Sequence, residues 1–376
     1  MKRPIAALLA CAVFGAAGQA VAPPPVAARA YILVDALSGQ TLAAESAEDR
    51  FEPASLAKLM TAYVVFAALR ERKLDEAQAV PVSENAANQA GSRMFIAPGK
   101  PVTVRELLQG LAVQSGNDAA VALAEAVAGS EEQFVGLMNR QAARLGLANT
   151  HFANATGEPA RAQYSSARDV ASLTLALIRD FPERYPLFAQ KEYTYNRVAQ
   201  TNRNRLLWTD PTVDGVKTGF TEAAGYCLAA SARRGERRLV SVVLGARTEN
   251  LRGTETQKLL NFGFQVYETR RVYAKGVPVA QPEVYKGTRA SVPVGFRQDV
   301  WLTLPRDHFA GIRGVLVTRK PFVAPLAAGE KAGIMKLMRD NATLAEFPVV
   351  ALEDVPVAGF LSRGWDTLRL LVESSK

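Results

Sequence analysis

The stretch EPASLAK (residues 52–58) opens an apolar run over residues 59–69, which predicts a buried helix. Pro53 suits the first positions of a helix, where its missing N–H would be unpaired anyway. Ser55 and Lys58 are three residues apart, so both side chains lie on one face of the first turn. A lysine amine with a lowered pKa can take the proton of a serine hydroxyl and make it a nucleophile. A polar cap at a helix start explains the same residues, because Ser-x-x-Lys is common by chance.

Two further motifs follow along the chain, SGN at residues 115–117 and KTG at residues 217–219. In this order, S-x-x-K, S-x-N and K-T-G form the signature of penicillin-binding proteins and class A β-lactamases. Nearby stretches, QSGNDA (114–119), QYSSARD (163–169) and NRNRLLW (202–208), resemble the D-alanyl-D-alanine carboxypeptidases. These are low-molecular-mass penicillin-binding proteins, serine peptidases of the S11 type that trim peptidoglycan. The resemblance extends over nearly the whole chain.

Strand and helix patterns alternate irregularly over residues 23–268, which predicts an α+β domain. Strands are expected over residues 30–35, 41–44, 213–221, 228–232 and 239–244, and helices over residues 59–69, 103–113, 118–127, 131–145, 167–178 and 254–262. Thr103 and Glu106 form a capping-box pattern. The SGN motif falls on the break between two helices, and the KTG motif falls on an edge strand open to an extended substrate. The resemblance implies a transpeptidase domain like that of β-lactamases, with an antiparallel sheet and helices.

The character of the sequence changes near residue 272, where valine and proline become frequent and helical periodicity ends. Short strands are expected over residues 300–304, 314–318, 332–338 and 343–352, with a turn at Asp340-Asn341. Residues 269–356 are therefore predicted to form a small all-β domain. No catalytic constellation falls in it.

The tail, residues 357–376, places apolar and polar residues on opposite faces of a short helix. Phe360 and Trp365 lie on the apolar face. Such a helix is too short to span a bilayer but suits an anchor in the membrane interface. A terminal helix packed on the protein body is the alternative. The resemblance implies that the tail holds the enzyme on the outer face of the cytoplasmic membrane.

The chain has 376 residues and a net charge of +9, and nearly half of its residues are apolar. This composition is typical of a globular protein with a substantial core. Basic residues are not clustered among aromatic residues, which argues against nucleic-acid binding. An anionic membrane surface or polymer is a better match for the positive charge.

The N-terminus reads as a secretory leader, residues 1–22: Lys2 and Arg3 precede an apolar stretch and a small-residue cleavage site. A lipoprotein site at Cys11 is the less favoured alternative. Removal of the leader would leave Cys227 as the one thiol, so we expect no internal disulfide. Cys227 is expected to be buried in a strand. The leader predicts an exported, periplasmic protein.

The resemblance implies a role for each motif residue. Ser55 attacks the carbonyl between two terminal D-alanines, and Lys58 takes its proton. Lys217 helps keep Lys58 neutral, because two nearby cations repel each other. Ser115 relays a proton to the departing amine, and Asn117 orients Lys58 and the substrate amide.

The resemblance also implies a substrate-binding set. The backbone N–H groups of Ser55 and Phe220 form the oxyanion hole. Gly219 leaves room for the substrate backbone, and Thr218 and Lys217 flank it. Arg252 binds the terminal carboxylate, with Arg203 in support, although either arginine could instead form an ordinary surface ion pair. A β-lactam beside its own carboxylate would mimic the dipeptide and trap Ser55.

Other chemistries have little support in the sequence. The chain has two histidines, His151 and His308, no Gly-x-Ser-x-Gly elbow and no His/Cys spacing typical of zinc. We therefore expect neither a metal nor a cofactor.

Three alternatives to a carboxypeptidase stay open. A β-lactamase would use an additional glutamate, for which Glu158 is the candidate, but the residues after it do not match. A DD-endopeptidase would cut cross-links instead of stems. A non-catalytic penicillin-binding module of the cell wall would form a stable adduct without releasing D-alanine.

Overall fold

The computed structural model describes residues 13–14, 21–318 and 321–373, so most of the expected leader, including Cys11, lies outside the described residues. The chain divides into two compact units. One comprises residues 22–265, and the other comprises residues from 266 onward together with the short strand β1 (Val13–Phe14).

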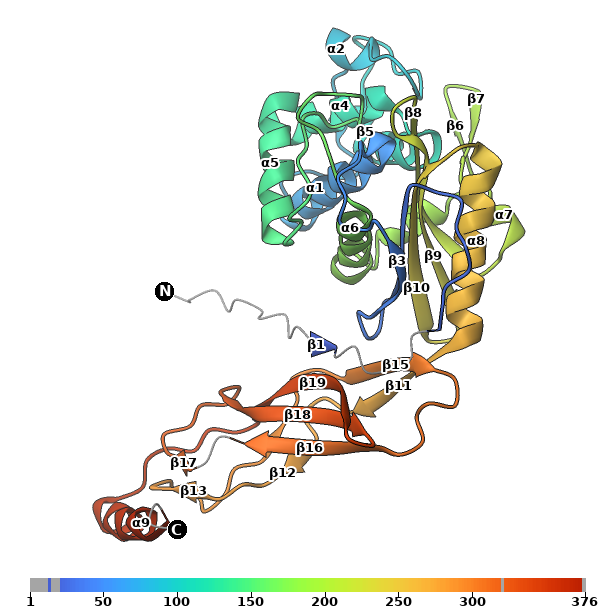
Figure 1. The fold of residues 1–376 in the computed structure, drawn as a ribbon. Coiled ribbons are helices and arrows are strands. Elements are labelled where there is room, and N and C mark those ends of the chain that lie inside the picture. The colour runs from blue at the N-terminus through green and yellow to red at the C-terminus, as the bar shows by residue number, and fades with distance from the viewer. Residues whose placement is uncertain (1–12, 15–20, 319–320, 374–376) are drawn as a thin grey trace. The chain divides into compact units, whose positions relative to one another are not determined.

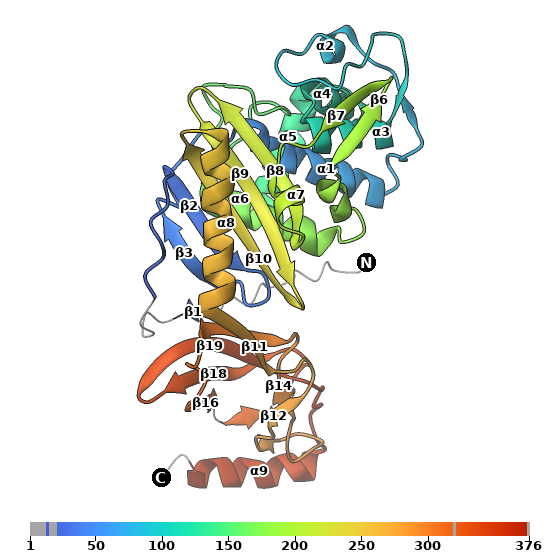
Figure 2. The same cartoon turned by 90° about the vertical axis from the view of Figure 1, so that its right-hand side faces the viewer.

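The first unit is built on a five-stranded antiparallel sheet in the order β3-β2-β10-β9-β8. Its strands are β2 (Ala30–Asp35), β3 (Thr41–Glu45), β8 (Val213–Thr221), β9 (Gly225–Arg234) and β10 (Arg237–Ala246). All five were expected, and the edge position of β8, which carries the KTG motif, is confirmed. Helix α8 (Glu249–Val266) crosses one face of the sheet, and the helices of residues 58–70, 117–128, 131–144 and 167–180 gather on the opposite face (Figures 1 and 2).

The helical layer contains the expected long helices, α1 (Lys58–Arg70), α4 (Asn117–Ala128), α5 (Glu131–Arg144) and α6 (Ala167–Asp180). Every residue of α1 except Arg70 is buried, which explains why its sequence is apolar on all sides. The short elements are η1 (Ala54–Ala57), β4 (Ala79–Val80), α2 (Glu84–Ala87), β5 (Val102–Thr103), η3 (Tyr185–Ala189), β6 (Glu192–Tyr195), β7 (Val198–Thr201) and α7 (Leu206–Thr209).

One predicted helix is interrupted. The capping box of Thr103 and Glu106 is present and starts α3 (Val104–Gln109) as expected. The α-helix does not continue to residue 113, because the chain changes to a π-helical segment, η2 (Gly110–Gln114). Such wide turns occur often at functional sites, since they redirect the residues that follow. Helix α8 is longer than predicted, because it begins at Glu249, five residues before the predicted start at residue 254.

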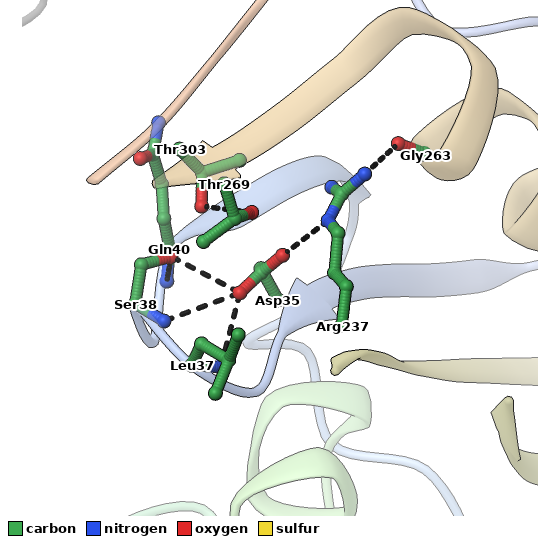
Figure 3. Close-up of polar contacts among 8 residues, drawn as sticks. All are labelled: Asp35, Leu37, Ser38, Gln40, Arg237, Gly263, Thr269 and Thr303. Carbon is green, nitrogen blue, oxygen red and sulfur yellow. Dashed lines mark hydrogen bonds and ion pairs between the residues drawn. The ribbon is translucent and has the colours of Figure 1, made fainter. Parts of the chain in front are cut away.

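A buried ion pair between Asp35 and Arg237 links the end of β2 to the end of α8 (Figure 3). Asp35, fully buried at the end of β2, accepts a hydrogen bond from Arg237 Nε at 2.8 Å. The same carboxylate accepts from the backbone N–H groups of Leu37 and Ser38. Arg237 Nη1 in turn donates to the carbonyl oxygen of Gly263 at 2.9 Å, in the last turn of α8. These contacts join β2, β10 and α8 through one arginine.

In its described residues, the second unit consists of strands and one helix near the C-terminus. Its main sheet has the order β12-β14-β19-β18-β16, with β1 added to β19. The strands are β11 (Tyr267–Tyr273), β12 (Pro278–Ala280), β13 (Val284–Tyr285), β14 (Val294–Gly295), β15 (Val300–Pro305), β16 (Ile312–Thr318), β17 (Phe322–Val323), β18 (Lys331–Arg339) and β19 (Ala342–Ala351). The four predicted strands and the turn at Asp340-Asn341 are confirmed. Strand β11 was missed, and it pairs with β15, where the hydroxyl groups of Thr269 and Thr303 lie 2.9 Å apart (Figure 3).

The tail forms the helix α9 (Phe360–Glu373). Polar side chains attach it to the β domain: Asp366 accepts a hydrogen bond from the backbone N–H of Lys286, and Arg369 lies 3.0 Å from the carboxylate of Glu283. Phe360 and Trp365 are 82% and 68% exposed. Within the described residues, no helix combines the length and the apolar character that crossing a bilayer requires.

Candidate active site

Ser55 lies on a single 3-10 turn, η1, immediately before the first residue of α1. The turn begins after Pro53, so the proline stands at the helix start as expected. Ala54, Leu56 and Ala57 are buried, while Ser55 is partly exposed. The packing of its neighbours therefore fixes Ser55 with its hydroxyl accessible.

Lys58 lies under Ser55 and is fully buried. Its Nζ donates to Ser55 Oγ at 3.0 Å, to Asn117 Oδ1 at 2.6 Å and to the carbonyl oxygen of Thr156 at 2.5 Å. Burial lowers the pKa of Lys58 to about 7; the negative charge of Glu158 opposes this change. Near neutral pH a large share of Lys58 is therefore unprotonated and can accept the Ser55 proton.

Ser115 and Lys217 form a second hydroxyl–amine pair. Ser115 follows the π-helical segment and has a left-handed backbone, with φ of 64°, which turns it out of the helix. Lys217 Nζ donates to Ser115 Oγ at 2.8 Å and to the Thr218 carbonyl oxygen at 3.1 Å. Burial lowers the pKa of Lys217 well below its ordinary value, and the positive charge of Lys58 lowers it further. Burial, rather than repulsion by Lys217, is the main cause of the lowered pKa of Lys58.

One cavity of about 470 Å³ opens above these two pairs. Eight of the ten residues singled out from the sequence line it: Ser55, Ser115, Asn117, Arg203, Thr218, Gly219, Phe220 and Arg252. The other two, Lys58 and Lys217, lie beneath its floor, bonded to Ser55 and Ser115. Segments far apart in the sequence thus converge on one polar site.

The edge strand β8 passes close to Ser55. A Cβ atom on Gly219 would lie 3.2 Å from the Ser55 backbone nitrogen and 3.1 Å from Ala54 Cβ, tighter than ordinary contacts. Glycine therefore allows the strand and the η1 turn to approach each other. Phe220, the next residue of this strand, lines the same cavity as Ser55.

Two arginines, Arg203 and Arg252, line the cavity and contact each other. Arg252, in the first turn of α8, is buried, and its Nη2 donates to the carbonyl oxygen of Arg203 at 3.2 Å and to Glu249 at 2.8 Å. Arg203 is exposed and flanked by buried Asn202 and Asn204, of which Asn204 bonds the Gly215 carbonyl oxygen of β8. Arg252 thus forms an ion pair with Glu249 and also lines the cavity. Both arginines supply positive charge to the cavity that Thr218 lines.

Sequence reasoning missed one wall of the cavity, formed by Gly91, Ser92, Arg93 and Phe95. Asp118 holds this wall, because its carboxylate accepts hydrogen bonds from the backbone N–H groups of residues 94, 95 and 96 at 2.8–3.2 Å. Asn117 adds a bond from its backbone N–H to the Ser92 carbonyl oxygen at 2.6 Å. The sequence did contain a clue to this wall, because Asp118 directly follows the SGN motif. An aspartate that becomes buried at such a place is rarely without a partner for its carboxylate.

The remaining residues of interest lie away from the chemistry. Cys227 is buried in β9, as expected, and burial raises the pKa of its thiol to about 11. The Nδ1 atom of His151 lies 2.9 Å from the Ala162 carbonyl oxygen. Across the part of the chain that the structure describes, no three His, Cys, Asp or Glu side chains are grouped so that they could hold a metal ion.

Comparison with known families matches both parts of the chain. Residues 17–248 match the family described as D-alanyl-D-alanine carboxypeptidase, and residues 267–357 match the C-terminal domain of penicillin-binding protein 5. The chain is 42% identical to the D-alanyl-D-alanine carboxypeptidase DacC of Escherichia coli, covering 93% of this chain and 90% of that protein. It is 38% identical to DacF of Bacillus subtilis, covering 89% and 87%.

Solved structures agree with these matches. Penicillin-binding protein 5 from Haemophilus influenzae superimposes with a TM-score of 0.87 at 38% identity, covering 89% of this chain and 99% of that one. Penicillin-binding protein 6B from Escherichia coli gives a TM-score of 0.75 at 36% identity, covering 89% and 98%. The predicted fold class, a transpeptidase domain followed by an all-β domain, is confirmed.

Proposed function

The chain belongs to the D-alanyl-D-alanine carboxypeptidase family, and we propose that it removes the last D-alanine of peptidoglycan stem peptides through an acyl-enzyme on Ser55. As a member of this family it is a serine hydrolase of the penicillin-binding type. The observation that carries the proposal is the 3.0 Å hydrogen bond between Lys58 Nζ and Ser55 Oγ. It joins a nucleophile to a base whose pKa is about 7.

Acylation begins when Ser55 Oγ attacks the carbonyl carbon between the two D-alanines, while neutral Lys58 takes the hydroxyl proton. The negative charge that develops on the carbonyl oxygen is stabilised by the backbone N–H groups of Ser55 and Phe220. Loss of one such donor typically costs about 10²–10³ in rate. Asn117 keeps the Lys58 amine next to Ser55, because its Oδ1 accepts a hydrogen bond from Lys58 Nζ.

The C–N bond then breaks, and the departing amine needs a proton. Ser115 Oγ lies at the end of a hydrogen bond from Lys217 Nζ, so it can pass a proton outward and recover one from the lysine. The free D-alanine leaves, and the acyl group stays on Ser55 as an ester. Lys58 first passes the proton that it took from Ser55 to the Ser115–Lys217 pair, which gave one to the amine, and so becomes neutral again. Water then attacks the ester while Lys58 takes a proton from it, and this proton goes to Ser55 Oγ as the ester bond breaks and the shortened peptide leaves.

The substrate ends in a free carboxylate, and the cavity is lined by side chains that can bind one. Thr218 offers a hydroxyl, and Arg252 and Arg203 offer positive charge. A β-lactam also carries a carboxylate beside its amide, so the same groups would bind it while Ser55 opens its ring. Penicillin acylation of Ser55 is therefore part of the proposal.

We further propose that the protein is exported, periplasmic and held peripherally on the outer face of the cytoplasmic membrane through α9. The support is the arrangement of this helix: Asp366 and Arg369 attach it to the β domain, while Phe360 and Trp365 are exposed. Two exposed aromatic side chains on a short helix match an interfacial helix.

D-alanine release from a pentapeptide ending in D-Ala-D-Ala tests the activity. We expect release by the wild type, none by Ser55→Ala, and full release by Ser130→Ala, which changes a helix cap away from the cavity. A fluorescent penicillin should label the wild type and Ser130→Ala but not Ser55→Ala. Labelling of Ser55 without D-alanine release would overturn the carboxypeptidase in favour of a non-catalytic module or an endopeptidase.

A further inference from the structure

A five-residue loop, residues 154–158, reaches into the active site from the connection between α5 and α6. Asn154 Oδ1 shapes the loop by accepting hydrogen bonds from the Thr156 backbone N–H, the Thr156 hydroxyl and the Gly157 backbone N–H, at 3.2, 3.0 and 2.7 Å. Its Nδ2 donates to the carbonyl oxygen of Glu158 at 2.9 Å, as does Gln163 Nε2 at 2.7 Å. The backbone on both sides of Glu158 is therefore fixed by its own neighbours.

The loop contacts both members of the Lys58–Asn117 pair. The carbonyl oxygen of Thr156 accepts a hydrogen bond from Lys58 Nζ at 2.5 Å. Two residues later, Glu158 Oε1 accepts from Asn117 Nδ2 at 2.7 Å. The general base and the amide that orients it are thus both tied to one rigid segment.

Two contacts, one with Glu158 and one with the Ala90 carbonyl oxygen, settle which way the Asn117 amide points. Its Nδ2 donates to Glu158 Oε1 and to the Ala90 carbonyl oxygen at 2.6 Å, which leaves Oδ1 to accept from Lys58 at 2.6 Å. The reversed amide would place Oδ1 against two oxygens and Nδ2 against an amine. Gly91 closes over this contact, since a Cβ there would lie 2.8 Å from Asn117 Nδ2 and 2.9 Å from Glu158 Oε1.

We propose that Glu158 is a positioning residue of the carboxypeptidase reaction, which holds the Asn117 amide with its oxygen toward Lys58 and thereby keeps the base in line with Ser55. This inference rests on the proposed function. Glu158 itself lines the cavity and is exposed. It acts on the reacting atoms through Asn117 and Lys58.

The charge of Glu158 has a second, separable effect. The charged groups around Lys58 are Glu158 on this loop, Asp118 on α4, Arg203 before α7 and Lys217 on β8. Glu158 and Asp118 raise the pKa of Lys58, and Arg203 lowers it. Removal of the Glu158 charge therefore lowers that pKa further and makes the neutral amine available at lower pH.

Two variants separate the hydrogen bond from the charge. Glu158→Gln keeps an oxygen that can accept from Asn117 Nδ2 but removes the charge, whereas Glu158→Leu removes both. The readout is the rate of acylation by a fluorescent penicillin as a function of pH, with D-alanine release measured beside it. Glu84→Gln, which neutralises an exposed carboxylate of α2, is the matched control.

We expect Glu158→Gln to keep the wild-type rate at high pH and to move the midpoint of the acidic limb to lower pH. Glu158→Leu should show the same movement and should also lose about tenfold to a hundredfold of the rate at high pH, because the base is no longer held in line. Glu84→Gln should change neither quantity. Thermal unfolding of each variant shows whether it is folded.

Two results would overturn the inference. In the first, the acidic limb of the pH profile is unchanged in Glu158→Gln and Glu158→Leu keeps the full acylation rate. In the second, both variants lose the same share of the acylation rate at high pH. The second result would make the carboxylate itself a reacting base. Because penicillin acylation needs no D-alanine release, failure of this inference is distinct from failure of the carboxypeptidase function, which would show as absent release by the wild type.

Discussion

Gly157 packs directly against the carbonyl group of Ala54, the residue before the nucleophile. A Cβ atom at Gly157 would lie 1.9 Å from Ala54 O and 2.9 Å from the Ser55 backbone nitrogen. The backbone of Gly157 is also left-handed, with φ of +89°. Only glycine combines this conformation with so close an approach, so the loop and the η1 turn fix each other's positions.

Substitution of this glycine should affect catalysis more than stability. We expect Gly157→Ala to displace Ser55 from Lys58 and to reduce penicillin acylation by about a hundredfold. Gly129→Ala is a matched control, because Gly129 has a similar φ of +81° but a Cβ there would meet nothing within 4 Å. The control should lose about 1–2 kcal/mol of unfolding free energy through backbone strain and keep its acylation rate. Equal acylation rates in the two variants would contradict this prediction.

The acylation rate should depend on pH through Lys58. The amine must be neutral to take the Ser55 proton, and burial lowers its pKa to about 7. The rate should therefore be low below this pH, rise through a midpoint near it and level off above it. Lys58→Arg stays protonated throughout, so it should lack both the rise and the activity. Stopped-time labelling with a fluorescent penicillin across this range measures the midpoint; a flat profile in the wild type would exclude Lys58 as the base.

The ion pair of Asp35 and Arg237 should make a large contribution to stability. The exposed fraction of the Asp35 side chain is 0% and that of Arg237 is 13%. Asp35→Ala would remove the carboxylate from this buried pair, which should cost about 3–5 kcal/mol of unfolding free energy in urea. Glu71→Gln removes one partner of an exposed pair with Lys73, whose side chains are 53% and 73% exposed, and should cost less than about 1 kcal/mol. A loss below about 1 kcal/mol for Asp35→Ala would show that the buried pair is dispensable.

The proposed membrane anchoring through α9 should depend on the exposed aromatic residues of this helix. Replacing both Phe360 and Trp365 by aspartate should reduce binding of the full chain to phosphatidylglycerol vesicles at least about tenfold, because two apolar side chains no longer enter the interface. D-alanine release should be unchanged. Val277→Asp makes the same kind of change at a valine of the β domain that is 53% exposed, and it should leave vesicle binding nearly intact. Co-sedimentation with the vesicles measures the binding of both variants. Undiminished binding by the double variant would refute the proposal that α9 anchors the protein.

Local patterns predicted most of the fold. Strands β2 and β8 have the bounds expected from the sequence, and the capping box of Thr103 and Glu106 starts α3 as expected. These features depend on neighbours within a few residues, so the sequence contains them directly. The π-helical turn before Ser115 could not be read in this way, because an apolar run favours a regular helix and only packing widens it.

The sequence by itself determined which side chains the proposed chemistry uses: Ser55 and Lys58 on one turn, Ser115 and Asn117 at a helix break, and Lys217 on an edge strand. Their types and spacing also indicated the family. The tertiary structure decided how they work together. Burial lowers the pKa of Lys58, and the loop ending at Glu158 brings a carboxylate to Asn117 from 41 residues away. Desolvation and long-range contacts arise only when distant segments pack, so no local pattern in the chain could specify them.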